Sequence, residues 1–273
     1  SPVVKWFWYI FAGGIVAIML LFLSASLGLL GEMPDFKHLE NPETNLATEI
    51  ITADGKSLGK FYLDENRTPI KFKDLPKSLV DALIATEDER FYEHSGIDVR
   101  GTLRAMFFFG SRGGASTITQ QLAKQLFHKE KKRGLGRYTQ KIKEWVIATR
   151  LEKQYTKEEI LAMYFNVYDF NNNADGIRSA AKIYFDKEPK NLKIEEGAML
   201  VGMFKNSALY NPVKNKVGVT NRRNVVLAQM AKNNYITQEE KDSLQKLPLK
   251  IKFTPESHND GLATYFCEYL RTY

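Results

Sequence analysis

An apolar stretch near the N-terminus limits what this chain can fold into. Residues Trp6 to Leu30 carry no charged side chain and are almost wholly apolar. A helix over this run is long enough to cross the roughly 30 Å hydrocarbon core of a bilayer. A cleaved signal peptide is the alternative, since residues 24–28 read SASLG, but the apolar core of a signal is usually about 7 to 15 residues long. We therefore predict one transmembrane helix within an anchor of residues 1–34.

Charges beside the apolar stretch predict its orientation. Lys5 precedes the stretch, whereas Glu32, Asp35 and Glu40 follow it. Positively charged flanks stay on the cytoplasmic side, so we expect a single-pass protein whose body lies on the outer face of a membrane. The net charge of +7 favours an anionic partner such as a lipid headgroup or a phosphorylated substrate. At the outer face of a membrane we do not expect nucleic acid as a partner.

Beyond the anchor, residues 35–75 read as a stalk with a small β element, and residues 76–250 as a mainly helical region. Asp54-Gly55 separates two β-prone runs, Ala47–Thr52 and Leu58–Leu63, which is a strong hairpin signal. Thr68 to Phe72 could add a third strand. The single cysteine, Cys267, has no partner for a disulfide, and no spacing of Cys, His or carboxylates predicts a metal site.

A carboxylate pair, Glu87 and Asp88, lies in the stretch ATEDERFYEHSGID. A helix starting near Pro76 would place Glu87 in an apolar stripe. That stripe is formed by Val80, Ile84 and Phe91. Desolvation of a glutamate is one way to obtain a general acid or base that works near neutral pH. The alternative is a structural ion pair between Glu87 and Arg90 or Arg104.

A second distinctive stretch, Gly113 to Phe127, reads GGASTITQQLAKQLF. Ser116, and Thr117 with Gln120 in capping-box spacing, mark the start of a helix behind a glycine-rich turn. The unpaired N–H groups at such a start could receive a phosphate. Capping accounts for Ser116 and Thr117, but it does not account for two consecutive glutamines, Gln120 and Gln121.

Two further segments each leave two interpretations open, and a third predicts a turn. Arg137, Lys141 and Glu144 share one helix face, either as an exposed ion pair worth about 0.3 to 0.5 kcal/mol or as a diphosphate clamp beside a second carboxylate. The apolar run Met106–Phe109 is either a buried helix end or a flap that dips into the membrane. Asparagines within Tyr164–Ile177 indicate a long turn, because asparagine tolerates positive φ.

Taken together, these stretches resemble the glycosyltransferase family 51 domain, the peptidoglycan glycosyltransferase of class A penicillin-binding proteins. The resemblance covers roughly Ile50 to Pro212. Its first motif, E-D-x-x-F-x-x-H-x-G, corresponds to Glu87, Asp88, Phe91, His94 and Gly96. Its second motif, G-x-S-T-I-T-Q-Q, is complete from Gly114 to Gln121.

The remaining motifs of the family are present with changes. The third, R-K-x-x-E, stands as Gln140, Lys141 and Glu144, with glutamine in place of arginine. The fourth keeps Tyr164 and Asn166 but has asparagine at two positions where the family commonly has glycine. The stretch around Tyr210-Asn211-Pro212 resembles the fifth motif, with Lys205 preceding it.

The resemblance implies a mainly α, lysozyme-like domain that polymerises lipid II, releases undecaprenyl diphosphate and uses the 4-hydroxyl of a second lipid II as nucleophile. Glu87 would be the general base, Glu144 the second carboxylate, and Lys141 a cation at the departing diphosphate. A divalent ion, Mg²⁺, would bridge the substrate phosphates. The expected substrate-binding residues are Asp88, Phe91, His94, Ser116, Thr117, Gln120, Gln121, Arg137, Lys141, Tyr164, Asn166 and Lys205.

The resemblance also implies a place in the cell and neighbouring partners. We expect the bacterial cytoplasmic membrane, an extracytoplasmic catalytic domain, and contact with lipid II, lipid-linked glycan and membrane lipid. Residues 251–273 resemble the linker that leads into a transpeptidase domain. A lysozyme-like hydrolase that cleaves the same glycan with water is the nearest rival, and a non-catalytic glycan binder is the second.

Overall fold

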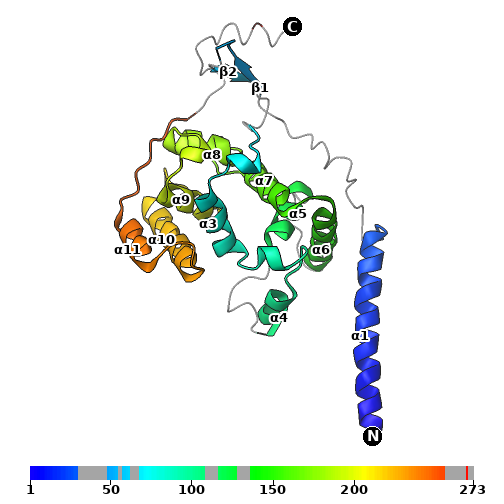
Figure 1. The fold of residues 1–273 in the computed structure, drawn as a ribbon. Coiled ribbons are helices and arrows are strands. Elements are labelled where there is room, and N and C mark those ends of the chain that lie inside the picture. The colour runs from blue at the N-terminus through cyan, green and yellow to red at the C-terminus, as the bar shows by residue number, and fades with distance from the viewer. Residues whose placement is uncertain are drawn as a thin grey trace.

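The computed structural model describes residues 1–29, 48–54, 57–61, 68–107, 116–127, 136–255 and 269. Within these residues the chain is mainly helical, with one two-stranded β element (Figure 1). The fold class predicted from the sequence is therefore confirmed. Beyond the anchor the α-helices are α3 (Lys77–Glu87), α4 (Val99–Phe107), α5 (Ile118–Phe127), α6 (Gly136–Gln154), α7 (Lys157–Val167), α8 (Gly176–Phe185), α9 (Ile194–Met203), α10 (Lys216–Lys232) and α11 (Gln238–Lys246).

The predicted membrane helix is α1, Pro2–Ser26, which is long and apolar enough to cross a membrane. Figure 1 shows α1, in blue, extending away from the helical body. Its last turns contact α6: the rings of Phe22 and Trp145 stack with centroids 6.0 Å apart. Arg150 Nη2 donates to the carbonyl oxygen of Ser26 at 3.2 Å. The anchor is thus seated on the domain that follows it.

The hairpin prediction is confirmed, whereas the third strand is wrong. Strands β1 (Thr48–Ile51) and β2 (Ser57–Phe61) pair antiparallel, outside the helical body (Figure 1). Residues 68–71 form no strand, and a 3₁₀ turn, η1 (Phe72–Asp74), follows them. The reason is that the backbone N–H and carbonyl oxygen of Ile70 are both hydrogen-bonded to the Asn166 side chain on α7, each at 2.9 Å. A strand partner would need those same groups.

The core gathers around two sets of helices. α3, α9 and α10 pack against one another, and α5 packs on α6 and α7. α9 is buried almost throughout, which its apolar sequence IEEGAMLVGM explains after the first turn. The predicted apolar stripe of α3 is confirmed, since Val80 and Ile84 are buried in this core. The two sets bring the end of α3 and the start of α5 together.

Local signals read from the sequence hold at several turns. Thr156 and Glu159, which stand in the Thr-x-x-Glu spacing of a capping box, form one at the start of α7. Asn171, Asn172 and Asn173 all have left-handed backbones, with φ of 62°, 55° and 62°. These are the positive φ angles expected of the asparagine turn.

The predicted flap lies mostly outside the described residues. Its first phenylalanine, Phe107, ends α4 and is 77% exposed. At this residue the helix end is therefore not buried. Residues 108–115 are not described.

Candidate active site

A cavity of about 410 Å³ opens between α3, α4, α5 and α10. The helix α3 begins after its N-cap, Pro76, and ends at Glu87. The Glu87 side chain lines the cavity and is 15% exposed. We call this space the main cavity. It is lined by Ala85, Thr86, Glu87, Asp88, Glu89, Arg90, Asp98, Arg104, Ser116, Thr117, Gln121, Arg222, Val225, Gln229 and Lys232.

Both carboxylate oxygens of Glu87 are engaged by groups from other helices. Gln121 Nε2, on α5, donates to Oε2 at 3.1 Å, and Arg222 Nη2, on α10, lies 3.4 Å from Oε1. Tyr164, on α7, donates its hydroxyl to Gln121 Oε1 at 2.7 Å. A carboxylate only accepts, so the Gln121 amide must turn its nitrogen to Glu87 and its oxygen to Tyr164. Tyr164, Gln121 and Glu87 thus form one chain of hydrogen bonds, which we call the relay.

The tyrosines beside Glu87 keep their protons. Burial raises the pKa of Tyr164 well above its ordinary value, with the charge of Glu87 acting in the same direction. Burial also raises the pKa of Tyr168 to about 12. At neutral pH Tyr164 is therefore a hydrogen-bond donor to the relay and not a competing base.

Glu87 forms an ion pair, but its partner is neither Arg90 nor Arg104, so the predicted partners are wrong. Arg90 pairs with Asp98 at 2.5 Å and with Glu89 at 3.2 Å, and Arg104 lies 3.9 Å from Glu89. The cation that faces Glu87 comes from α10 instead. No sequence motif marked α10, because its orientation follows from helix packing and not from a local pattern.

Asp88 joins the two distinctive stretches found in the sequence, residues 85–98 and 113–127, into one unit. Its carboxylate is 8% exposed. It accepts from the Ile118 backbone N–H at 3.0 Å and from His94 Nε2 at 3.0 Å. Asp88 thus caps the start of α5 with charge, and His94 holds it from the other side.

The carbonyl oxygen of Gly96 forms a second connection between the same two stretches. Thr117 Oγ1 donates to it at 2.8 Å and Gln120 Nε2 at 3.0 Å. The Gln120 N–H donates to Thr117 Oγ1 at 3.1 Å, but the Gln120 side chain serves Gly96, so the capping box is only half formed. Gly96 has φ of +87°, and a Cβ there would lie 2.8 Å from the Ala148 carbonyl oxygen. Only glycine fits this approach.

The second predicted carboxylate, Glu144, is buried on α6 with 6% exposure. Lys141 Nζ lies 3.2 Å from its Oε2, and Gln140 Nε2 donates to its Oε1 at 3.3 Å. Lys141 also donates to Ser116 Oγ at 2.9 Å, which connects this pair to the main cavity. The ion pair of the simpler interpretation is therefore present, but its carboxylate is buried instead of exposed. Burial lowers the pKa of Lys141, with nearby Lys124 acting the same way against the opposing effect of Glu144.

The remaining predicted site residues lie in different surroundings. Phe91 is fully buried, with Lys157 Nζ 4.2 Å from its ring centroid. Asn166 is bound to the backbone of Ile70. Arg137 and Lys205 are exposed, and neither is among the described residues that line the main cavity.

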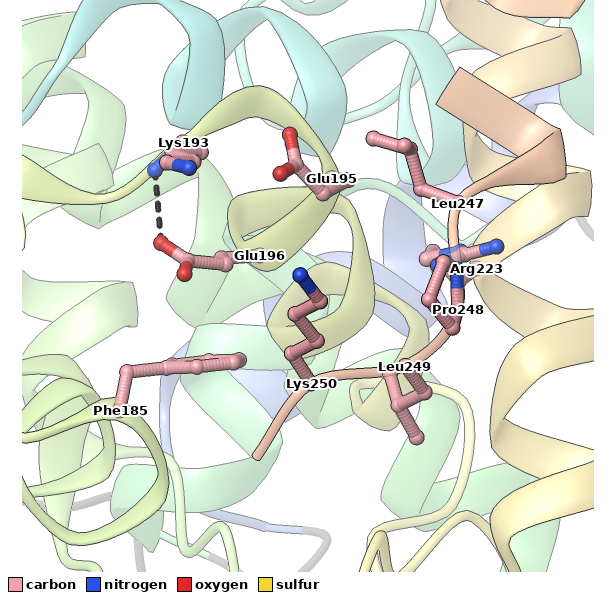
Figure 2. Close-up of a pocket in the computed structure, with 9 residues that line it drawn as sticks. All are labelled: Phe185, Lys193, Glu195, Glu196, Arg223, Leu247, Pro248, Leu249 and Lys250. Carbon is pink, nitrogen blue, oxygen red and sulfur yellow. Dashed lines mark hydrogen bonds between the residues drawn. The ribbon is translucent and has the colours of Figure 1, made fainter. Parts of the chain in front are cut away.

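A smaller cavity of about 130 Å³ lies between the start of α9, α10 and the segment after α11 (Figure 2). Two of its charged residues, Glu196 and Arg223, are hydrogen-bonded to neighbouring parts of the fold. Glu196 accepts from the Lys193 backbone N–H at 2.9 Å, the dashed bond in Figure 2, and from Lys187. Arg223 is 1% exposed and donates to Asn224 and to the Gln245 carbonyl oxygen.

A helical body with a half-buried carboxylate at its cavity, and a second, buried carboxylate paired with lysine beside it, is the arrangement expected of a lysozyme-like domain. The chain belongs to the transglycosylase family, whose model matches residues 54–231. It is 34% identical to penicillin-binding protein 1A of Pseudomonas aeruginosa over 98% of this chain and 32% of that protein. It is 38% identical to penicillin-binding protein 1A of Vibrio cholerae over 81% of this chain and 27% of that protein.

A relative from another bacterium and one solved structure are similar as well. Penicillin-binding protein 1F of Bacillus subtilis is 34% identical over 92% of this chain and 36% of that protein. The crystal structure of penicillin-binding protein 1A from Haemophilus influenzae aligns with a TM-score of 0.45 and 25% identity, covering 83% of this chain and 23% of that one. The chain thus spans about a quarter to a third of the length of the curated relatives it matches.

Proposed function

We propose that this chain is a membrane-anchored peptidoglycan glycosyltransferase. Its substrate is lipid II, its product a β-1,4-linked glycan strand, and its leaving group undecaprenyl diphosphate. The observation that carries the proposal is Glu87, held at the main cavity by Gln121 and Arg222, with the Lys141–Glu144 pair next to Ser116 on the same cavity. Family membership supports the reaction class.

In this proposal Glu87 is the general base. The Arg222 guanidinium and the Gln121 amide N–H bind its two oxygens and hold the carboxylate at the main cavity. Glu87 accepts the proton of the acceptor's 4-hydroxyl as that oxygen bonds to the anomeric carbon of the donor. The bond from that carbon to the diphosphate breaks, and the diphosphate leaves with the electron pair.

The leaving diphosphate needs positive charge where its own charge develops. Lys141 supplies it in this proposal, held by Glu144 and by Ser116 at 2.9 Å. Lys124, close enough to influence the pKa of Lys141, adds a second cation on α5. Gln140 stands where the family has arginine, so lysines and not arginine carry this part of the site.

A divalent ion remains a prediction. Among the residues that the structure describes, no three His, Cys, Asp or Glu side chains gather as a metal site. We expect an ion such as Mg²⁺ to arrive on the phosphates of the substrate, which suits its preference for phosphate and water ligands. No step above depends on it.

The anchor and its sidedness belong to the same proposal. α1 would cross the bacterial cytoplasmic membrane once, and the catalytic domain would lie on the extracytoplasmic side, where lipid II and lipid-linked glycan are reached from the membrane surface. The basic net charge and the contact between α1 and α6 support a domain held close to lipid.

The test compares two substrates in one experiment. The detergent-solubilised protein is incubated with labelled lipid II and Mg²⁺, and separately with finished peptidoglycan, and the products are separated by size. Long glycan from lipid II with intact peptidoglycan supports the proposal; soluble fragments without polymer would identify a lytic glycosidase. Glu87→Gln should abolish polymer, whereas Glu239→Gln, an exposed control on α11, should not. Full turnover in Glu87→Gln would refute the assignment of the base.

A further inference from the structure

We infer that Lys157, the first residue of α7, is a positioning residue that acts together with Glu152 on the two distinctive stretches of the active site. The inference rests on the proposed function, since it gives Lys157 a part in keeping Glu87 in place. Neither residue is one of the motif positions named above, and neither is among the described residues that line the main cavity. Any effect on the reaction must therefore reach Glu87 through other side chains.

The start of α7 does not by itself explain a lysine at position 157. Thr156 and Glu159 already cap this helix, and the N-terminal end of a helix carries a partial positive charge, which disfavours a cation. The Lys157 side chain is nevertheless only 23% exposed, and its Nζ lies 4.2 Å from the ring centroid of the buried Phe91. Tertiary contacts therefore account for this lysine better than the helix does.

Lys157 connects α6 to the stretch that follows Asp88. Its Nζ donates to the His94 carbonyl oxygen at 2.7 Å and to Glu152 Oε1 at 2.8 Å. The Glu152 side chain is 4% exposed, and a carboxylate buried to this degree needs a paired charge and hydrogen bonds. Lys157 and Glu152 thus form a buried pair, one member of which binds the backbone of a catalytic stretch.

Glu152 extends the buried pair to α5. The Thr119 hydroxyl donates to Glu152 Oε1 at 2.5 Å. Thr119 is the fully buried second threonine of the motif G-x-S-T-I-T-Q-Q, and this hydrogen bond gives it a role. Through the buried pair, a residue two positions before Gln121 is connected to the carbonyl oxygen of His94.

A chain of contacts connects the buried pair with Glu87. The His94 side chain donates to Asp88, which accepts from the Ile118 N–H at the start of α5. One turn further along α5, Gln121 donates to Glu87. If the His94 backbone shifts, the start of α5 and its Gln121 shift with it. A displacement of about 1 Å can cost on the order of a hundredfold in rate, even when its origin lies away from the reacting groups.

The test measures kcat and KM for lipid II polymerisation in Lys157→Met, Lys157→Arg and Glu152→Gln. We expect kcat to fall about tenfold to a hundredfold in Lys157→Met. KM should stay within about twofold of the wild type, since neither residue lines the cavity. Lys157→Arg keeps a cation with several donors and should recover most of kcat. Glu152→Gln should lower kcat only about threefold to tenfold, because a glutamine oxygen can still accept from Thr119.

Two readouts separate positioning from a general loss of stability. Amide hydrogen exchange at Ile118 should be faster in Lys157→Met, since the acceptor of that N–H is no longer held in place. In a Gln121→Leu background Glu87 has already lost its contact with α5, so Lys157→Met should lower kcat by a smaller factor than in the wild type. Lys153→Met, the same change at an exposed position on α6, should match the wild type in every measurement.

Three results would overturn the inference. The first is a wild-type kcat in Lys157→Met, and the second is a raised KM at unchanged kcat, which would give the lysine a role in substrate binding. The third is an equal loss of kcat in the wild-type and Gln121→Leu backgrounds. If Lys157→Met does not fold, Glu152→Gln decides by the same measurements, and a wild-type kcat again overturns the inference. A wild-type protein that makes no polymer from lipid II would instead refute the proposed function.

Discussion

Replacing Tyr164 with phenylalanine removes one oxygen atom from the relay behind Glu87 and leaves its packing intact. The Tyr164 ring is fully buried and stacks on Phe204 with centroids 4.8 Å apart. A phenylalanine ring keeps that stacking. What disappears is the 2.7 Å hydrogen bond from the hydroxyl to Gln121 Oε1.

The expected cost follows from the group left behind. Gln121 Oε1 loses its donor in a partly buried place, so the free energy of unfolding should fall by about 1 to 3 kcal/mol. The amide of Gln121 is then free to turn over and present its oxygen to Glu87, which repels it. We expect kcat for polymerisation to fall on the order of tenfold, since the base is no longer held from α5.

Urea denaturation in detergent and steady-state polymerisation measure the two effects in Tyr164→Phe. Tyr92→Phe is the matched control, because the Tyr92 side chain is 59% exposed and its change should stay within about 0.5 kcal/mol. The relay also predicts that Tyr164→Phe and Gln121→Leu are not additive. Additive losses, or an unfolding free energy equal to that of the wild type, would refute the reasoning.

Three further predictions concern other parts of the site. Gly96→Ala should lower the melting temperature seen by thermal unfolding, because φ of +87° costs a side chain about 1 to 2 kcal/mol before the clash with α6 is counted; an unchanged value would contradict the close approach. Burial lowers the pKa of Lys141, so its charge is lost as pH rises through that lowered value, and initial rates should decline at alkaline pH and hold to higher pH in Lys141→Arg. Asn166→Ala should lower the unfolding free energy by about 1 to 3 kcal/mol and speed amide exchange at Ile70; wild-type exchange would refute that role.

Local signals made much of this fold predictable. The apolar stripe of α3 with Glu87 at its end, the capping box at Thr156, and the asparagine turn each depend on a few neighbouring residues. Such short-range rules act wherever the chain is later placed. The hairpin was predictable for the same reason, since the sequence places the turn-favouring pair Asp-Gly between the two strands that pair.

Contacts between distant residues were not predictable in this way. Arg222 reaches Glu87 because Gly202 lets α10 lie close to α9, and no spacing along the chain encodes that distance. The prediction of a third strand was wrong for a related reason. Ile70 finds its hydrogen-bond partner in Asn166, 96 positions away, and not in a neighbouring strand. Sequence motifs identified the carboxylates, whereas tertiary packing determines which side chains bind them.

The seat of α1 on α6 has a mechanical consequence. The stacking of Phe22 on Trp145 and the hydrogen bond from Arg150 to Ser26 connect the end of α1 directly to α6. A helix longer than the bilayer is thick tilts until its apolar residues are covered. With α1 across a membrane, that tilt would turn α6 and carry Lys141 and Glu144 with it. The thickness of the surrounding lipid would then act on the helix that carries these two residues.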